Sequence, residues 1–201
     1  VRDRLRRAGL TSSRRAAWSF RTTPVENAAA ATRALAWANA ILRRETVGAL
    51  LIYGSVGTGK TGLAHATLRH LVEHGQHGHF ITVRDLLADL RDSYTASRPA
   101  VFERALGVGV LVLDDLGAER PTDWTREQLA VIVNGRYEQR RPIFLTTNYG
   151  PDQLDHPDFL GGRVVDRLAH LCRWVRVGGR NLRRGIALVG DDEDTSEGET
   201  P

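Results

Sequence analysis

The chain has 201 residues, enough for one α/β domain with short appendages but too few for two domains of ordinary size. Its single cysteine, Cys172, excludes an internal disulfide and a cysteine-based zinc site, and no apolar run approaches the ~20 residues of a membrane-spanning helix. The net charge of +4 includes six acids in residues 191–201, so residues 1–190 carry +10, which favours a polyanionic partner such as nucleic acid. We expect a cytoplasmic protein that does not contact membranes.

Predicted helices and strands alternate along the chain. Thr23, Pro24 and Glu26 match a capping box, which predicts a helix that begins there and runs to about residue 44. Strands are expected over residues 47–53, 79–83, 108–113, 143–147 and 174–177, and further helices over 60–74, 84–93, 100–106, 122–140 and 162–171. This alternation predicts a three-layer α/β sandwich with a five-stranded parallel sheet.

The two ends of the chain differ from this domain in charge. We expect residues 1–22 to be a basic N-terminal arm, residues 23–190 the folded domain, and residues 191–201 an acidic, disordered tail. Too few residues follow the last predicted strand to form a separate helical lid, so none is expected.

A glycine-rich turn joins the first predicted strand to the next helix. Its sequence, GSVGTGKT, matches the phosphate-loop pattern G-x-x-x-x-G-K-[ST] in the strand–loop–helix context that the pattern requires. The amides of such a loop point at phosphate oxygens, the lysine reaches the β and γ phosphates, and the hydroxyl binds Mg²⁺. The loop consists of Gly54, Ser55, Val56, Gly57, Thr58, Gly59, Lys60 and Thr61. Lys60 is the only lysine in the chain, so the lysine-containing guanine motif is absent and ATP is the expected nucleotide.

Polar side chains follow two other predicted strands. Asp114 and Asp115 end the run VLVLDD, and Asn148 ends the run LTTN. We expect Asp114 on the Mg²⁺ side of a bound nucleotide, Asp115 as the general base and Asn148 as a sensor of the γ-phosphate. Glu119 is the alternative base, because the Asp115 side chain is shorter than the glutamate that commonly serves as the base in phosphate-loop proteins that hydrolyse nucleotides.

Taken with longer strings, these motifs resemble a known family, the AAA+ ATPases of the DnaC/IstB type. The strings are VLVLDDLGAE, DWTREQLAVIVNGRYEQRRPIFLTTN and GGRVVDRL, and the resemblance covers roughly residues 15–185. It implies an AAA+ phosphate-loop fold and ATP-dependent assembly into an oligomer or helical filament on single-stranded DNA. It also implies an arginine that reaches the next subunit's site, for which Arg167 is the best match and Arg163 the second. Arg183 resembles an arginine often found near the end of these chains.

Several functions remain open at this level. The leading one is loading of the replicative helicase during DNA replication, and the alternative is an IstB-like helper of a transposase. A small-molecule kinase is less favoured, and a nucleotide-binding scaffold without turnover is compatible with Asp115. Since only 22 residues precede the capping box, we expect the docking module of typical loaders to be missing or truncated.

Weaker features admit ordinary explanations. His74, His77 and His79 are dense enough for a metal site, but a polar loop accounts for them. Trp18 and Phe20 lie beside arginines and could stack on bases, although packing of the arm against the core is favoured. Arg91, Arg98 and Arg104 lie where relatives place DNA-facing helices, with solvated helix faces as the alternative.

Overall fold

A parallel sheet organises the molecule. The computed structural model describes residues 1–10, 18–23, 28–95, 100–118, 122–156, 159–160, 162–179 and 181–182. Its strands are β1 (Ala49–Tyr53), β2 (Gly78–Thr82), β3 (Val110–Leu116), β4 (Ile143–Thr147) and β5 (Cys172–Arg176), in the spatial order β2-β3-β4-β1-β5. Every neighbouring pair is parallel, which confirms the predicted five-stranded sheet.

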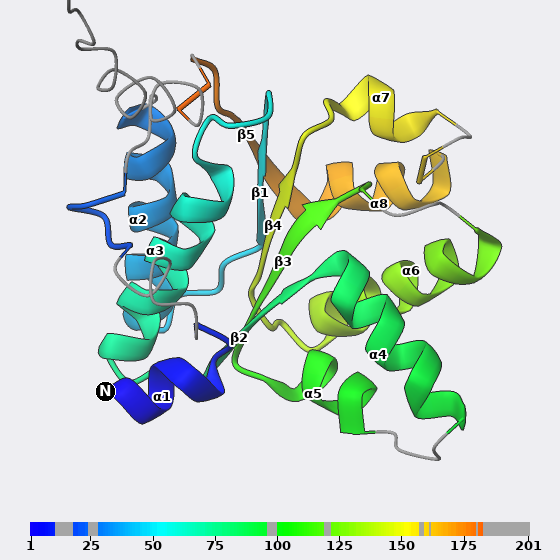
Figure 1. Cartoon of the computed structure of the whole chain (residues 1–201), viewed down its shortest axis with the longest axis horizontal. Helices are drawn as coiled ribbons and strands as arrows, with labels where there is room; N and C mark the ends of the chain where they lie inside the picture. The colour runs from blue at the N-terminus through cyan, green and yellow to red at the C-terminus, as the bar shows by residue number, and fades with distance from the viewer. Residues whose placement is uncertain are drawn as a thin grey trace, which may run out of the picture.

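Helices cover both faces of the sheet (Figure 1). The helices are α1 (Arg2–Arg7), α2 (Ala28–Leu42), α3 (Lys60–Glu73), α4 (Val83–Thr95), α5 (Ala100–Gly107), α6 (Asp123–Glu138), α7 (Pro151–Asp155) and α8 (Gly162–Leu171). Figure 1 shows α2 and α3 on one side of the sheet, and α4, α5, α6 and α8 on the other. None of the described helices is long and apolar enough to cross a membrane.

Alternate residues along each strand enter two separate cores. Leu50, Ile52 and Phe144 belong to a buried cluster with α2 and α3. Leu51 and Leu145, one residue further along the same strands, belong to the cluster under the helices of the other face. Because side chains alternate across a strand, burial on both faces produces the near-continuous apolar runs seen in the sequence.

The N-terminal helix covers the edge of the sheet. The Phe80 amide of β2 donates to the Ala8 carbonyl at 2.8 Å, and Ala8 and Leu10 are buried. These contacts pair part of an otherwise exposed edge strand. The predicted boundary between arm and domain at residue 23 stays a prediction.

The structure adds elements to those predicted. α1 and α7 were not expected, because short helices carry too little apolar periodicity to be recognised. β3 continues through Asp114 and Asp115 to Leu116, where the predicted strand ended at residue 113. The capping-box residues 24–27 and the acidic tail lie outside the described residues.

Candidate nucleotide site

The phosphate loop lies at the carboxyl edge of the sheet, between β1 and α3. Gly54, Gly57 and Gly59 have φ angles of 144°, 84° and 95°, a region that glycine adopts at little cost. Gly59 immediately precedes Lys60, the first residue of α3, so the loop delivers its chain directly into a helix N-terminus. The amides and dipole of such a terminus favour an anion.

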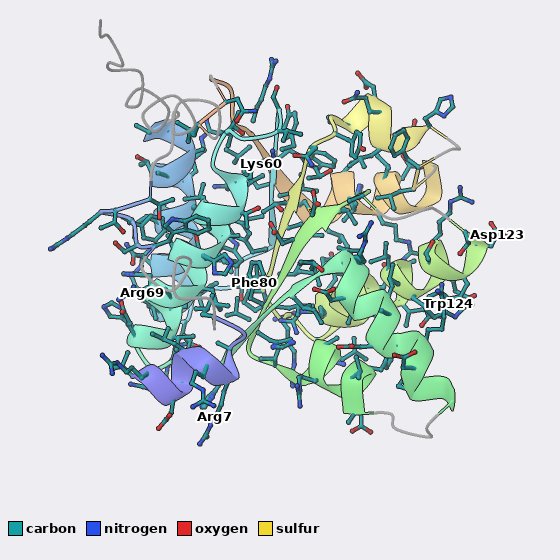
Figure 2. All side chains as sticks on the ribbon, in the orientation of Figure 1. Arg7, Lys60, Arg69, Phe80, Asp123 and Trp124 are labelled. Atoms are coloured by element: carbon teal, nitrogen blue, oxygen red, sulfur yellow. The ribbon has the colours of Figure 1, made fainter. Side chains whose placement is uncertain are left out.

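Lys60 is folded over the loop that precedes it. Its Nζ donates to the carbonyls of Gly54 and Ser55, both at 2.7 Å, and the residue is only 7% exposed. The Thr58 hydroxyl donates to the Ser55 carbonyl at 2.9 Å. Figure 2 shows Lys60 at the end of α3 that lies near the strand ends. The ammonium group is therefore held at the loop, near the position where the motif requires it.

The paired aspartates meet the end of β4. Asp114 is 4% exposed, and its Oδ1 accepts the Thr146 hydroxyl at 2.5 Å. Asp115 is exposed, and its Oδ1 accepts from Asn148 Nδ2 at 2.9 Å. Because β3 and β4 are adjacent and parallel, the three polar residues predicted from two separate strands lie together.

These groups share one cavity of about 440 Å³. It is lined by Trp18, Thr23, Val56, Gly57, Gly59, Lys60, Thr61, Gly62, Thr82, Asp114, Asp115, Thr146, Asn148 and Leu182. A cavity of this volume is in the range that holds small ligands and cofactors. Five of the eight predicted loop residues line it, as do both aspartates and Asn148.

Residues beyond the motifs complete the cavity. Trp18 packs edge-on against His65 of α3, with ring centroids 5.5 Å apart, and Thr23 contacts Gly62. Phe20 packs edge-on against His70, so both aromatic residues pack the N-terminal arm against α3, which is the interpretation favoured from the sequence. Trp18 also lines the cavity. Sequence reasoning missed Thr23, Gly62, Thr82, Thr146 and Leu182 as lining residues; among them Thr146 carried a signal, because it stands within the LTTN strand end.

The segment after β5 lies over the phosphate loop. The Leu182 amide donates to the Gly57 carbonyl at 3.0 Å, and a Cβ on Gly57 would stand 1.9 Å from Asn181 Oδ1. A Cβ on Gly54 would stand 2.0 Å from the Val177 carbonyl oxygen. A side chain at position 54 would therefore meet backbone, and one at position 57 would meet the Asn181 side chain. Glycine avoids both contacts.

Arg167 does not line this cavity. It is exposed on α8, and its Nη1 donates to Asn134 Oδ1 of α6 at 2.8 Å. None of the described residues of α8 lines the cavity. The Arg163 side chain, and residues Glu119 and Arg183, lie outside the part of the chain whose side chains are described.

The structure shows the surroundings of several of the weaker sequence features. No group of three or more potential metal ligands occurs among the described residues, and His79 is half-buried in β2, where burial lowers its pKa. The Arg91 guanidinium stacks over the Trp124 ring at 5.0 Å. α4 also carries Asp85, Asp89 and Asp92, so its surface is mixed in charge rather than basic.

Comparison with known proteins identifies the family. The family model described as IstB-like ATP binding protein matches residues 5–187. The chain belongs to this family. The IstB-like fold is shared with solved AAA+ phosphate-loop domains: the chain matches a crystal structure of the DnaC helicase loader with a TM-score of 0.71 and 29% identity, over 83% of this chain and 100% of that one.

Curated relatives of this IstB-like chain are longer. It is 28% identical to the replicative helicase loader DnaI of Bacillus subtilis (strain 168), over 67% of this chain and 47% of that protein. It is 27% identical to the replicative helicase loader DnaC of Escherichia coli (strain K12), over 61% of this chain and 50% of that protein. The chain thus spans about half the length of these relatives.

Proposed function

We propose that the chain binds ATP with Mg²⁺ in the phosphate-loop cavity and hydrolyses it. The observation that carries this proposal is the convergence of a buried lysine, Lys60, and a buried carboxylate, Asp114, on one cavity beneath a glycine loop. The Thr61 hydroxyl and Asp114 carboxylate are oxygen donors that suit Mg²⁺, so the residues fit the ion that they would hold. Bound Mg²⁺ would offset the negative charge that develops on the phosphates.

The chain's own residues then have distinct roles. Lys60 would exchange its two neutral carbonyl acceptors for charged phosphate oxygens, which form stronger hydrogen bonds. Asp115 is exposed at the cavity wall, so its carboxylate would accept a hydrogen bond from the attacking water and take up its proton. Asn148 would hold Asp115 in this orientation. Glu119 remains the alternative base.

Three cavity residues outside the motifs, Trp18, Thr23 and Leu182, would suit a purine base. Thr23 Oγ1 is buried and has no hydrogen-bond partner among the described residues, a situation that costs free energy unless a ligand supplies the partner. Trp18 offers a ring beside it and Leu182 an apolar contact. We expect adenine here, and a competition titration in which GTP binds as tightly as ATP would contradict that expectation.

The biological role that we propose is loading of the replicative helicase by a cytoplasmic assembly on single-stranded DNA. The curated relatives are named replicative helicase loaders, and the positive charge of residues 1–190 suits DNA. The family description favours a second candidate, an IstB-like ATPase that assists a transposase. Pull-down by purified replicative helicase against purified transposase distinguishes the two.

We further propose that the active site is shared between subunits of an oligomer or filament. Arg167 is exposed and does not line its own cavity, so it would serve a neighbour's γ-phosphate. Arg163 is the second candidate for this finger.

The deciding experiment measures phosphate release from ATP with and without single-stranded DNA. We expect Mg²⁺-dependent hydrolysis that DNA stimulates, and loss of it in Lys60→Ala. Nucleotide binding without any release would favour the scaffold, and phosphate transfer to a metabolite would favour the small-molecule kinase.

A further inference from the structure

Three consecutive side chains at the end of β4 form hydrogen bonds with the end of β3. The Thr146 hydroxyl accepts from the Asp115 amide at 3.0 Å and donates to Asp114 Oδ1 at 2.5 Å. The Thr147 hydroxyl donates to the Leu116 carbonyl at 2.6 Å, and Asn148 donates to the Asp115 carboxylate at 2.9 Å. Among these four hydrogen bonds, those of the Thr146 hydroxyl involve both aspartates.

The end of β3 needs such support because its backbone is irregular. The pairing of β3 with β4 shifts register between Leu113 and Leu116, and Asp115 has a φ of 64°. The left-handed region is unfavourable for a residue with a Cβ, so surrounding contacts must hold it there. The bulge turns Asp115 to an exposed position while Asp114 stays buried.

We propose that Thr146 is a positioning residue that orients the Asp114 carboxylate for Mg²⁺. Its hydroxyl joins the carboxylate to the backbone of the bulge, so one hydrogen-bonded unit fixes both the metal-side acid and the neighbouring acid. Thr146 is 1% exposed, so water does not compete for these bonds. The inference rests on the proposed ATP and Mg²⁺ site, and it adds a residue beyond Asp114, Asp115 and Asn148, the strand-end residues predicted for that site.

A purely structural role for Thr146 is the alternative, and Thr147 provides a matched control. Both residues are buried threonines of β4, and each hydroxyl donates to the end of β3. Thr147 binds a backbone carbonyl, whereas Thr146 binds the carboxylate. Substitution by valine removes the hydroxyl and keeps the shape in both cases. Loss of strand support alone would affect both variants, whereas loss of carboxylate orientation would affect only Thr146→Val.

The test measures Mn²⁺ binding to the protein–ADP complex by electron paramagnetic resonance, alongside metal-free binding of a fluorescent ADP. Removal of a group that orients a metal ligand typically weakens metal binding by about 10–100-fold. We expect a loss of that size in Thr146→Val, recovery in Thr146→Ser, and wild-type Mn²⁺ affinity in Thr147→Val. Metal-free nucleotide affinity should stay within about twofold of wild type in all three. If Thr146→Val does not fold, Thr146→Ala gives the same comparison with Thr146→Ser.

The outcomes distinguish failure of the positioning role of Thr146 from failure of the proposed nucleotide-binding function. Wild-type Mn²⁺ affinity in Thr146→Val, or an equal loss in Thr147→Val, would overturn the positioning role and leave the nucleotide site intact. A wild-type chain that binds neither ADP nor Mn²⁺ would overturn the proposed function and this inference together.

Discussion

At the scale of single residues, Arg136 is the most unusual side chain in the interior. It is fully buried on α6, and its guanidinium donates to five backbone carbonyls: two in the last turn of α5, two between α5 and β3, and that of Pro142 before β4. Burial lowers its pKa to about 9, with the charge of Arg141 adding to the effect. The group therefore stays a cation at neutral pH, and it ties together the ends of the sheet opposite the nucleotide cavity.

We predict that Arg136→Met destabilises the fold by about 3 kcal/mol or more, because buried carbonyls lose their donors. Arg136→Lys should also destabilise, since an ammonium group has three donors and no planar fork. Urea unfolding followed by circular dichroism measures the effect, with the exposed Arg33→Met of α2 as the control. A stability of Arg136→Met equal to that of the control would show that the carbonyls find other partners.

Cys172 provides a second residue-scale prediction. It is 8% exposed in β5, and burial raises the pKa of its thiol to about 12. Because only the thiolate reacts readily, the native thiol should resist a thiol reagent at pH 8 and react after unfolding in urea. Absorbance of the released reagent follows the reaction. Rapid labelling of the native chain would mean that β5 opens at the edge of the sheet.

At the scale of elements, the segment after β5 and the phosphate loop depend on each other. We predict that Gly57→Ala weakens ATP binding by about tenfold or more, because the added Cβ would meet Asn181 and displace either the segment or the loop. Equilibrium titration with a fluorescent ATP analogue measures the loss. Gly57→Ala combined with Asn181→Gly should recover part of the affinity.

Gly75→Ala is the matched control for this substitution. Gly75 has a φ of 92°, close to the 84° of Gly57, but nothing lies within 4 Å of its added Cβ. It should therefore show the backbone cost, roughly 1–2 kcal/mol of stability, without a loss of ATP affinity. Equal ATP affinity in both variants would remove the contact with Asn181 as an explanation.

How far the sequence predicts these elements depends on how local their causes are. The strand–loop–helix around Lys60 and the strand over residues 143–147 were predicted because apolar runs and a spaced motif are local signals. The extension of β3 through Asp115 was not, because it depends on hydroxyls of β4 some thirty residues away. For Trp18, packing was favoured over base stacking and a place in the cavity was not predicted, since no local pattern shows that α3 brings it there.

At the scale of the whole molecule, Arg167 bears on the proposed assembly because it is not among the residues that line its own cavity. An arginine finger stabilises charge on the departing γ-phosphoryl group, and its loss costs about 10³–10⁵ in rate. Since Arg167 is exposed on α8 and bonded to Asn134, we expect it to act on a phosphate in another subunit of a head-to-tail assembly. This expectation can be tested with two inactive variants, one that lacks Lys60 and one that lacks Arg167.

We predict that Lys60→Ala loses ATP affinity and that Arg167→Ala binds ATP but does not hydrolyse it. Mixing the two should restore part of the activity, because some interfaces pair the intact loop of an Arg167→Ala subunit with the intact finger of a Lys60→Ala subunit. Phosphate release across a series of mixing ratios, with single-stranded DNA present, measures the recovery. Arg173→Ala removes another exposed arginine and should stay active alone. If no ratio restores hydrolysis, Arg167 does not act across a subunit boundary, and Arg163→Ala takes its place in the same series.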